Sequence, residues 1–148
     1  MMAKTMHNHL VICGVGELGR TLAQQLLAAD STLSVILLDP RPGIPAELSQ
    51  EYPNVCHIVA DMTNLESLKA ANCAEARMIF LTSGSDTLNL EAAYKVMELN
   101  PQAEIWVRLY RSKLAELLDT SKKPNLHFFC PYQSAAETLV QRLLAPQP

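Results

Sequence analysis

Six short apolar runs recur along the chain, and most of them show no alternation between apolar and polar residues. Strands of a parallel sheet have this pattern when helices cover both faces, because neither side of the strand then meets water. The runs therefore predict six buried, mainly parallel strands. They cover residues 9–15, 33–38, 55–60, 78–83, 104–110 and 126–130.

The segments between these runs carry apolar residues at the spacing of an amphipathic helix. A further short helix is expected at residues 46–51, within a segment that contains several prolines. The periodic positions are Leu18, Leu22 and Leu26; Leu65 and Leu68; Leu88, Ala92, Val96 and Leu99; and Leu114, Leu117 and Leu118.

Some residues also mark helix ends. The sequences Thr63–Glu66 and Ser134–Glu137 fit the capping box, in which a hydroxyl and a carboxylate satisfy free N–H groups at a helix start. Asn100 stands before Pro101 and predicts the end of a helix, because the residue before a proline resists the helical conformation.

Strand and helix alternate along the whole chain, which predicts an α/β fold. The expected architecture is a Rossmann-like, doubly wound, mainly parallel six-stranded sheet with helices on both faces. The length of 148 residues fits a single domain. Within it, residues 119–125 are expected to form a hinge-like connection to the last strand and helix.

Composition excludes several classes of protein. A formal net charge of −3 argues against a nucleic-acid partner, which requires a basic surface. No stretch approaches the roughly 18 apolar residues of a membrane span, so direct membrane insertion is not expected. The four cysteines lie far apart without a C-x-x-C pair, which favours reduced thiols over a metal site.

The stretch "VICGVGELGR" (residues 11–20) places three glycines between a predicted strand and a predicted helix. In such a loop Gly14 permits a tight turn, Gly16 lets the backbone approach a pyrophosphate, and Gly19 lets helix and strand pack closely. The free N–H groups of the following helix also attract an anion. We therefore expect a phosphate-binding loop that includes the intervening Val15, Glu17 and Leu18.

Asp39 ends the second predicted strand, twenty residues after Gly19. A carboxylate at this place accepts hydrogen bonds from the ribose hydroxyls, and it would repel a 2′-phosphate. The pattern thus favours NAD or an adenine nucleotide over NADP, although Arg41 could reach a phosphate or remain a surface residue. The carboxylate of Glu17 inside the loop is unfavourable near a pyrophosphate unless it points to solvent or Arg20 compensates it.

Catalytic machinery is not evident in the sequence. None of the four tyrosines has a lysine four residues later, no residues remain for a substrate domain, and no nucleophile is paired with a base. We therefore expect no enzyme activity. The alternatives left open are the cofactor-binding domain of an NAD-dependent oxidoreductase and a Rossmann-like domain that has lost its ligand, in which Asp39 merely opens a turn.

The chain resembles the N-terminal domain of regulators of potassium conductance, also called TrkA-N. The resemblance rests on "HLVICGVGELGRTLAQQL", on "VILLDPRP", on the segment from "VADMTNLES" to "YKVMELNP", and on "AEIWVRLY". It implies a cytoplasmic regulatory domain, at the inner face of the cell membrane through its partner, that binds NAD(H), AMP, ADP or ATP. The implied partner is a membrane potassium channel, transporter or potassium/proton antiporter.

The resemblance also implies roles for individual residues. Gly14, Gly16 and Gly19 would hold phosphate, and Asp39 would hold the ribose. The other implied positions are Asp61 and Met62 against the adenine, Thr82, Ser83 and Gly84 closing over the nucleotide, and Asp86, Asn89 and Arg108 at the rim. Among these other positions, the group at residues 82–84 is supported independently of the resemblance, because it follows a parallel strand at its carboxyl end. Asp86 and Asn89 fit helix capping equally well, and Arg108 fits pairing with a carboxylate.

The last predicted helix carries an apolar stripe formed by Ala135, Ala136, Leu139, Val140, Leu143 and Leu144. The stripe could pack on the domain's own sheet or on a second copy of the chain. The family resemblance favours the second arrangement, a homodimer through this C-terminal helix.

Overall fold

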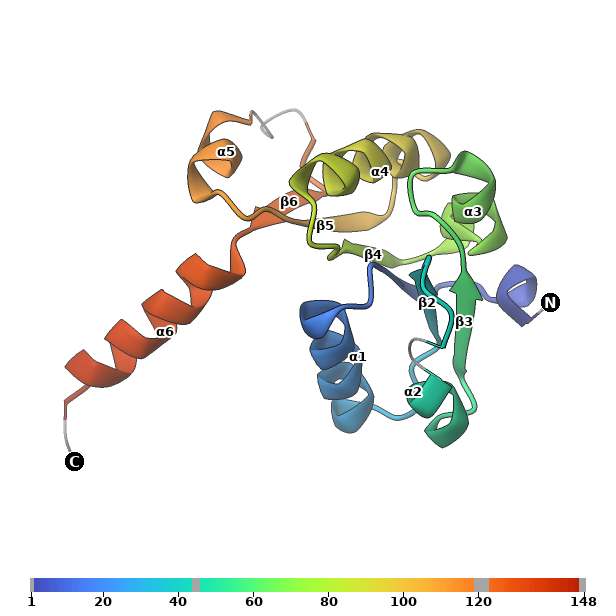
Figure 1. Cartoon of the computed structure of the whole chain (residues 1–148), viewed down its shortest axis with the longest axis horizontal. Coiled ribbons are helices and arrows are strands. Elements are labelled where there is room, and N and C mark those ends of the chain that lie inside the picture. Colours follow the sequence, from blue (N-terminus) through green and yellow to red (C-terminus); the bar gives the residue numbers. More distant parts are fainter. Residues whose placement is uncertain (1, 44–45, 119–122, 147–148) are drawn as a thin grey trace.

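The computed structural model describes residues 2–43, 46–118 and 123–146. Six strands form one sheet in the order β3-β2-β1-β4-β5-β6, and all neighbouring strands are parallel (Figure 1). This arrangement confirms the predicted doubly wound α/β fold. The strands are β1 (Leu10–Cys13), β2 (Val35–Asp39), β3 (Val55–Val59), β4 (Met78–Leu81), β5 (Glu104–Arg108) and β6 (Leu126–Phe129).

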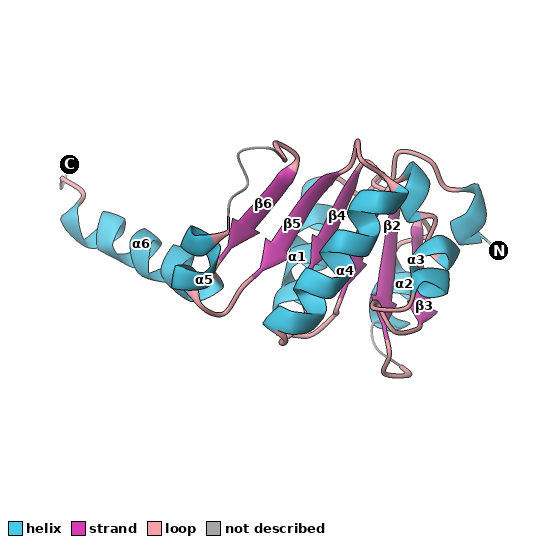
Figure 2. Cartoon of the chain, turned by 90° about the horizontal axis from the view of Figure 1, so that it is seen from above, coloured by secondary structure: helices cyan, strands magenta, loops and turns pink. Residues whose placement is uncertain are grey.

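Helices cover both faces of the sheet, as Figures 1 and 2 show. Helices α1 and α2 lie on one face, and α3 and α4 lie on the other. The bounds are α1 (Glu17–Ala29), α2 (Ala46–Glu51), α3 (Leu65–Ala70), α4 (Asp86–Leu99), α5 (Ser112–Leu117) and α6 (Pro131–Leu144), with short 3-10 helices η1 (Met2–Thr5) and η2 (Cys73–Glu75). The short helix expected at residues 46–51 is thus present.

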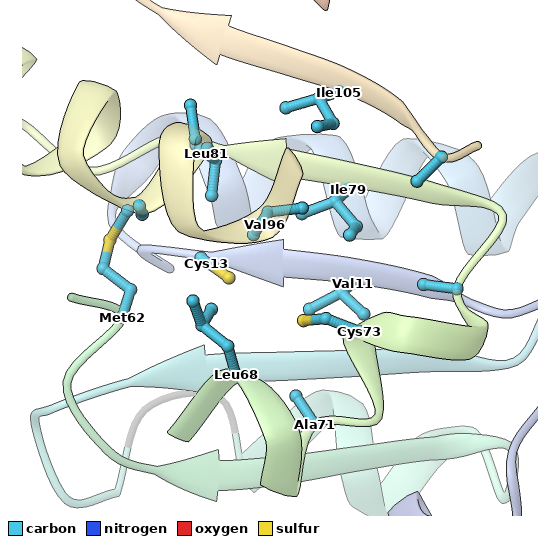
Figure 3. Close-up of a cluster of buried hydrophobic side chains, with 14 of the residues drawn as sticks. Val11, Cys13, Met62, Leu68, Ala71, Cys73, Ile79, Leu81, Val96 and Ile105 are labelled. Atoms are coloured by element: carbon cyan, nitrogen blue, oxygen red, sulfur yellow. The ribbon is translucent and has the colours of Figure 1, made fainter. Parts of the chain in front are cut away.

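The core consists of two apolar clusters, one on each side of the sheet. Val11 and Cys13 of β1 belong to the larger cluster, which Figure 3 shows with side chains of α3 and α4. The alternate residues Leu10 and Ile12 belong to the smaller cluster beside α1. Both sides of β1 are therefore buried, which explains why its sequence shows no polar alternation.

Two helix starts differ from the capping-box prediction. Asn64, not Thr63, caps α3 by accepting a hydrogen bond from the Glu66 N–H at 3.0 Å. The Thr63 hydroxyl instead donates to Asp61 at 2.8 Å, which draws it away from the helix. Helix α6 begins at Pro131 rather than Ser134, since a proline needs no N–H partner in the first helical turn.

The predicted helix end at Asn100 is confirmed, because α4 stops at Leu99 and Asn100 is its C-terminal cap. Residues 119–122 of the expected hinge-like connection lie outside the described residues. Across residues 2–43, 46–118 and 123–146, no helix combines the length and the apolar character needed to cross a lipid bilayer.

Candidate functional site

A cavity of about 750 Å³ opens at the carboxyl ends of β1, β2 and β4. Its volume falls in the range of small-molecule sites, which occupy the same edge of other open α/β sheets. The predicted site residues that line it are Gly14, Gly16, Glu17, Leu18, Asp39, Arg41, Asp61, Met62, Thr82, Ser83, Gly84 and Arg108. Val15 and Gly19 belong to the loop but are buried and do not line the cavity. Asp86 and Asn89 are not part of the lining either.

The three glycines have different surroundings. Gly14 has a φ of +89°, and a Cβ there would lie 2.5 Å from the Ser83 nitrogen. A Cβ on Gly19 would lie 2.3 Å from the Gly14 carbonyl oxygen. At Gly16 the nearest atom would be Arg41 Nη2 at 3.9 Å, so this backbone is open to the cavity. Gly14 and Gly19 thus allow close packing of the loop, and Gly16 leaves room for a ligand.

Gly16 is also the N-terminal cap of α1, and no side chain caps this helix. The N–H groups of the first helical turn have no intrahelical carbonyl to bond, and the helix dipole adds partial positive charge there. The arrangement favours an anion beside Gly16, such as a phosphate.

Asp39 joins the glycine loop to the end of β2. Its side chain is only 4% exposed, and its Oδ2 accepts a hydrogen bond from the Val15 N–H at 2.8 Å. Arg41 binds the same carboxylate through two side-chain hydrogen bonds of 2.9 Å. Arg41 is thus a surface residue, as one of the two alternatives for it has it, and it is paired with Asp39, a contact that the sequence analysis did not predict.

Two opposing influences set the pKa of the Asp39 carboxyl. Burial raises this pKa. The hydrogen bonds from the Arg41 side chain, the Arg41 backbone and the Val15 backbone lower it, and their combined effect is larger than that of burial. The net pKa lies below its usual value, so Asp39 is ionised at neutral pH. An ionised carboxylate can accept hydrogen bonds from both hydroxyls of a ribose.

Glu17 is exposed at the mouth of the cavity. Of the two alternatives left open for Glu17, the structure favours exposure over compensation by Arg20, because the Arg20 guanidinium donates to Glu47 of α2 at 2.6 Å. Exposure to solvent therefore remains the way in which the carboxylate of Glu17 is tolerated beside an anion site.

Residues after β4 form the opposite wall. The Thr82 hydroxyl donates to the Gly14 carbonyl at 2.8 Å and so fixes β4 to the glycine loop. Fully buried Asn89 accepts from the Ser83 N–H at 3.1 Å and donates to the Ser83 and Arg108 carbonyls. Asn89 thus positions this wall from behind and does not form the rim expected of it.

Neither rim residue of α4 caps that helix. Ser85 is the cap, since its hydroxyl accepts from the Leu88 N–H at 3.2 Å. Asp86 accepts from the Tyr110 N–H at 2.7 Å and lies in a neighbouring hollow with Tyr110 and Arg111. The sequence could not distinguish these roles, because the partners come from the loop after β5.

Arg108 reaches the cavity from β5. Its Nη1 donates to the Ser83 carbonyl at 2.9 Å, and its Nε is buried without a hydrogen-bond partner among the described residues. The expected pairing of Arg108 with a carboxylate is not seen in the described part of the chain. Arg108 also lines the cavity, and a guanidinium at this wall suits a second anionic group of a ligand.

Five lining residues were missed by the sequence analysis. Tyr132 is the most distant in sequence, and its ring packs edge-on against Tyr110 with ring centres 5.2 Å apart. Only the position at which α6 begins brings it to the cavity, so no local pattern could reveal it. The missed residues are Thr21, Pro40, Leu88, Pro131 and Tyr132.

The chemical groups of this lining suit the binding of a ligand. The described lining residues include no histidine, cysteine or lysine. The described residues also hold no group of three or more side chains able to bind a metal ion. The cavity offers instead an anion site at a helix N-terminus, an ionised carboxylate and an arginine.

Comparison with known proteins identifies a family. The TrkA-N domain profile matches residues 10–123. Potassium channel protein 1 of Methanocaldococcus jannaschii is 27% identical over 129 residues, which cover 87% of this chain and 38% of that protein. The chain thus spans well under half the length of this relative.

Solved structures share the fold at low identity. The TrkA-N domain of the inner membrane protein ybaL from Escherichia coli has a TM-score of 0.79 at 20% identity, covering 94% of this chain and 98% of that one. The Shewanella denitrificans Kef C-terminal domain in AMP-bound form has a TM-score of 0.73 at 19% identity, covering 95% and 83%. The GsuK channel bound to NAD has a TM-score of 0.65 at 20% identity, covering 83% and 22%.

Proposed function

Because the chain belongs to the TrkA-N domain family, we propose that it is a non-catalytic regulatory domain that binds an adenine nucleotide or NAD(H). The observation that carries this proposal is a single cavity at the carboxyl ends of the strands. It joins an uncapped helix N-terminus at Gly16 to the ionised carboxylate of Asp39. The two groups match the phosphate and the ribose of one nucleotide.

In the proposed binding mode the phosphate, the ribose and the adenine each contact a different part of the cavity. Phosphate groups lie against Gly16 and the first turn of α1, and the ribose hydroxyls bond to Asp39. The adenine lies against Asp61 and the buried Met62, while residues 82–84 form the facing wall. Arg108, which lines the cavity, faces a further phosphate or the second half of a dinucleotide.

The proposed ligand is AMP, ADP, ATP or NAD(H). Two solved structures of the same fold, one bound to AMP and one to NAD, support a ligand of this chemical class. Asp39 disfavours NADP because a carboxylate repels the 2′-phosphate. A membrane potassium channel, transporter or potassium/proton antiporter is the proposed partner. The proposed location is the cytoplasm, at the inner face of the cell membrane through this partner. The curated relative named above is a potassium channel protein.

A titration of the chain with AMP, ADP, ATP, NAD, NADH and NADP tests the proposal. Isothermal titration calorimetry is expected to give saturable binding of one or more of the first five, and weaker binding of NADP than of NAD. The matched variant Gly16→Val is expected to fold, because only Arg41 approaches a Cβ there, and to lose binding. Absence of binding with all six ligands contradicts the proposal, and steady oxidation of NADH with a simple carbonyl compound would favour an oxidoreductase.

We further propose a homodimer through α6. None of the residues of α6 is buried, and Figure 1 shows the helix projecting away from the body of the domain. Its apolar residues include Leu139 and Leu143, which are 67% and 81% exposed. Pro131 and Tyr132, at the start of the same helix, line the nucleotide cavity. A ligand in the cavity would thus touch the element that holds the dimer together.

Sedimentation equilibrium tests this dimer. The chain is expected to sediment as a dimer, and Leu139→Asp is expected to sediment as a monomer, because the charge would be buried in the interface. Gln141→Asp lies off the stripe and should remain dimeric. Since these side chains are exposed within one chain, both variants should unfold at the same denaturant concentration once the protein is dilute enough for the dimer to dissociate. A monomeric parent chain, or a dimeric Leu139→Asp variant, would contradict the interface.

A further inference from the structure

Arg41 is hydrogen-bonded to Asp39, the carboxylate that the proposed function assigns to the ribose. Oδ1 of Asp39 accepts hydrogen bonds from the Arg41 backbone N–H and from Arg41 Nε, both at 2.9 Å. Oδ2 accepts from the Val15 N–H at 2.8 Å and from Arg41 Nη2 at 2.9 Å. A carboxylate has about four lone-pair sites, so Asp39 has no acceptor left for a sugar hydroxyl.

The same guanidinium also extends over the glycine loop. A Cβ built on Gly16 would lie 3.9 Å from Arg41 Nη2. Arg41 therefore lies across the cavity between the place assigned to the ribose and the place assigned to the phosphate. Its side chain is 57% exposed, whereas that of Asp39 is 4% exposed, so the arginine can leave while the carboxylate stays.

We infer that Arg41 is a displaceable latch on the ribose subsite, and that a nucleotide with free 2′- and 3′-hydroxyls enters by replacing the two side-chain hydrogen bonds of Arg41 on Asp39. This inference rests on the proposed function. The latch keeps Asp39 paired in the empty domain and lowers the affinity for any ligand that needs the carboxylate. The two backbone hydrogen bonds to Asp39 remain, so its orientation is kept after the arginine moves.

The latch can be distinguished from other effects of Arg41 by comparing the affinities of two ligands, because it opposes only the contact between Asp39 and the sugar hydroxyls. A ligand without those hydroxyls gains nothing when Arg41 is removed. Any contact that Arg41 makes with a phosphate while it stays on Asp39 would affect both ligands equally. The ratio of the dissociation constants of 2′,3′-dideoxy-AMP and AMP therefore isolates the latch from other effects of Arg41.

Calorimetric titration with these two ligands tests the inference in the parent chain, in Arg41→Ala and in Arg20→Ala. Arg20→Ala is the matched control, because it removes a cation bound to Glu47 near the same loop without touching Asp39. The ratio is expected to rise about tenfold in Arg41→Ala, as for the loss of one competing charge-assisted hydrogen bond, and to stay unchanged in Arg20→Ala.

The possible results are separable. A ratio in Arg41→Ala that is unchanged or lower overturns the latch, while binding of AMP itself upholds the proposed function. A rise of equal size in Arg20→Ala overturns the latch as well, because the effect would then follow from net charge alone. Absence of AMP binding in all three chains overturns the latch, whereas the proposed function falls only if ADP, ATP, NAD and NADH also fail to bind.

Discussion

Replacing Gly14 by alanine is expected to lower the free energy of unfolding by about 3 kcal/mol. The φ of +89° disfavours any L-residue, which costs about 1–2 kcal/mol. In addition, the new Cβ would lie 2.5 Å from the nitrogen and 2.6 Å from the Cα of Ser83. These are backbone atoms at the end of β4, so the loop and the strand must separate, at about 1–3 kcal/mol more.

Gly43→Ala is the matched control for this prediction. Gly43 has a φ of +81°, but nothing lies within 4 Å of a Cβ built there. Its substitution should therefore cost only the backbone term of about 1–2 kcal/mol. Denaturant unfolding followed by circular dichroism measures both variants. Equal losses in the two would show that the contact between the glycine loop and Ser83 is unimportant.

The second large effect concerns affinity. Asp39→Asn is expected to weaken nucleotide binding about 100-fold, because two hydrogen bonds to a charged acceptor, each contributing about 1.5–3 kcal/mol, are weakened or lost. Asparagine keeps the shape of the side chain, but it has one oxygen for the two backbone N–H groups, of Val15 and Arg41, that bond to the two oxygens of Asp39. The variant should therefore also lose about 1–3 kcal/mol of stability, and its dissociation constant is measured at a temperature at which it is folded.

Asp30→Asn controls for the change in net charge. Asp30 follows α1 and accepts hydrogen bonds from Thr32, outside the cavity. Its variant is expected to bind nucleotide as the parent chain does, with both measured by calorimetry. An Asp39→Asn variant that retains full affinity would show that the ribose does not bind to this carboxylate.

Local periodicity was sufficient to predict the fold of this chain. The apolar runs and the helical spacing depend only on neighbouring residues, and each predicted strand and helix is present. The cavity at the end of β1 could also be predicted, because the glycine spacing and the position of Asp39 fix it. These features share one property, since the residues that carry them lie close together in the sequence.

The remaining features depend on partners distant in sequence or on competition among neighbours. Thr63 has the residue type of a cap, but Asp61 captures its hydroxyl, and Asn64 takes the role. Asn89 was expected at the rim, yet the carbonyl of Arg108, nineteen residues away, holds it inside. Tyr132 reaches the cavity only because α6 starts at a proline. None of these outcomes follows from a short sequence motif.

The central claim is that a nucleotide binds between the glycine loop and the end of β2. Amide chemical-shift mapping of the isotope-labelled chain during titration with ADP tests it most directly. The account predicts that the largest changes fall on Val15, Gly16, Glu17 and Arg41, and that they saturate together. Changes confined to the hollow near Tyr94 and Lys123, at the far end of α4, or no saturable change at all, would contradict it.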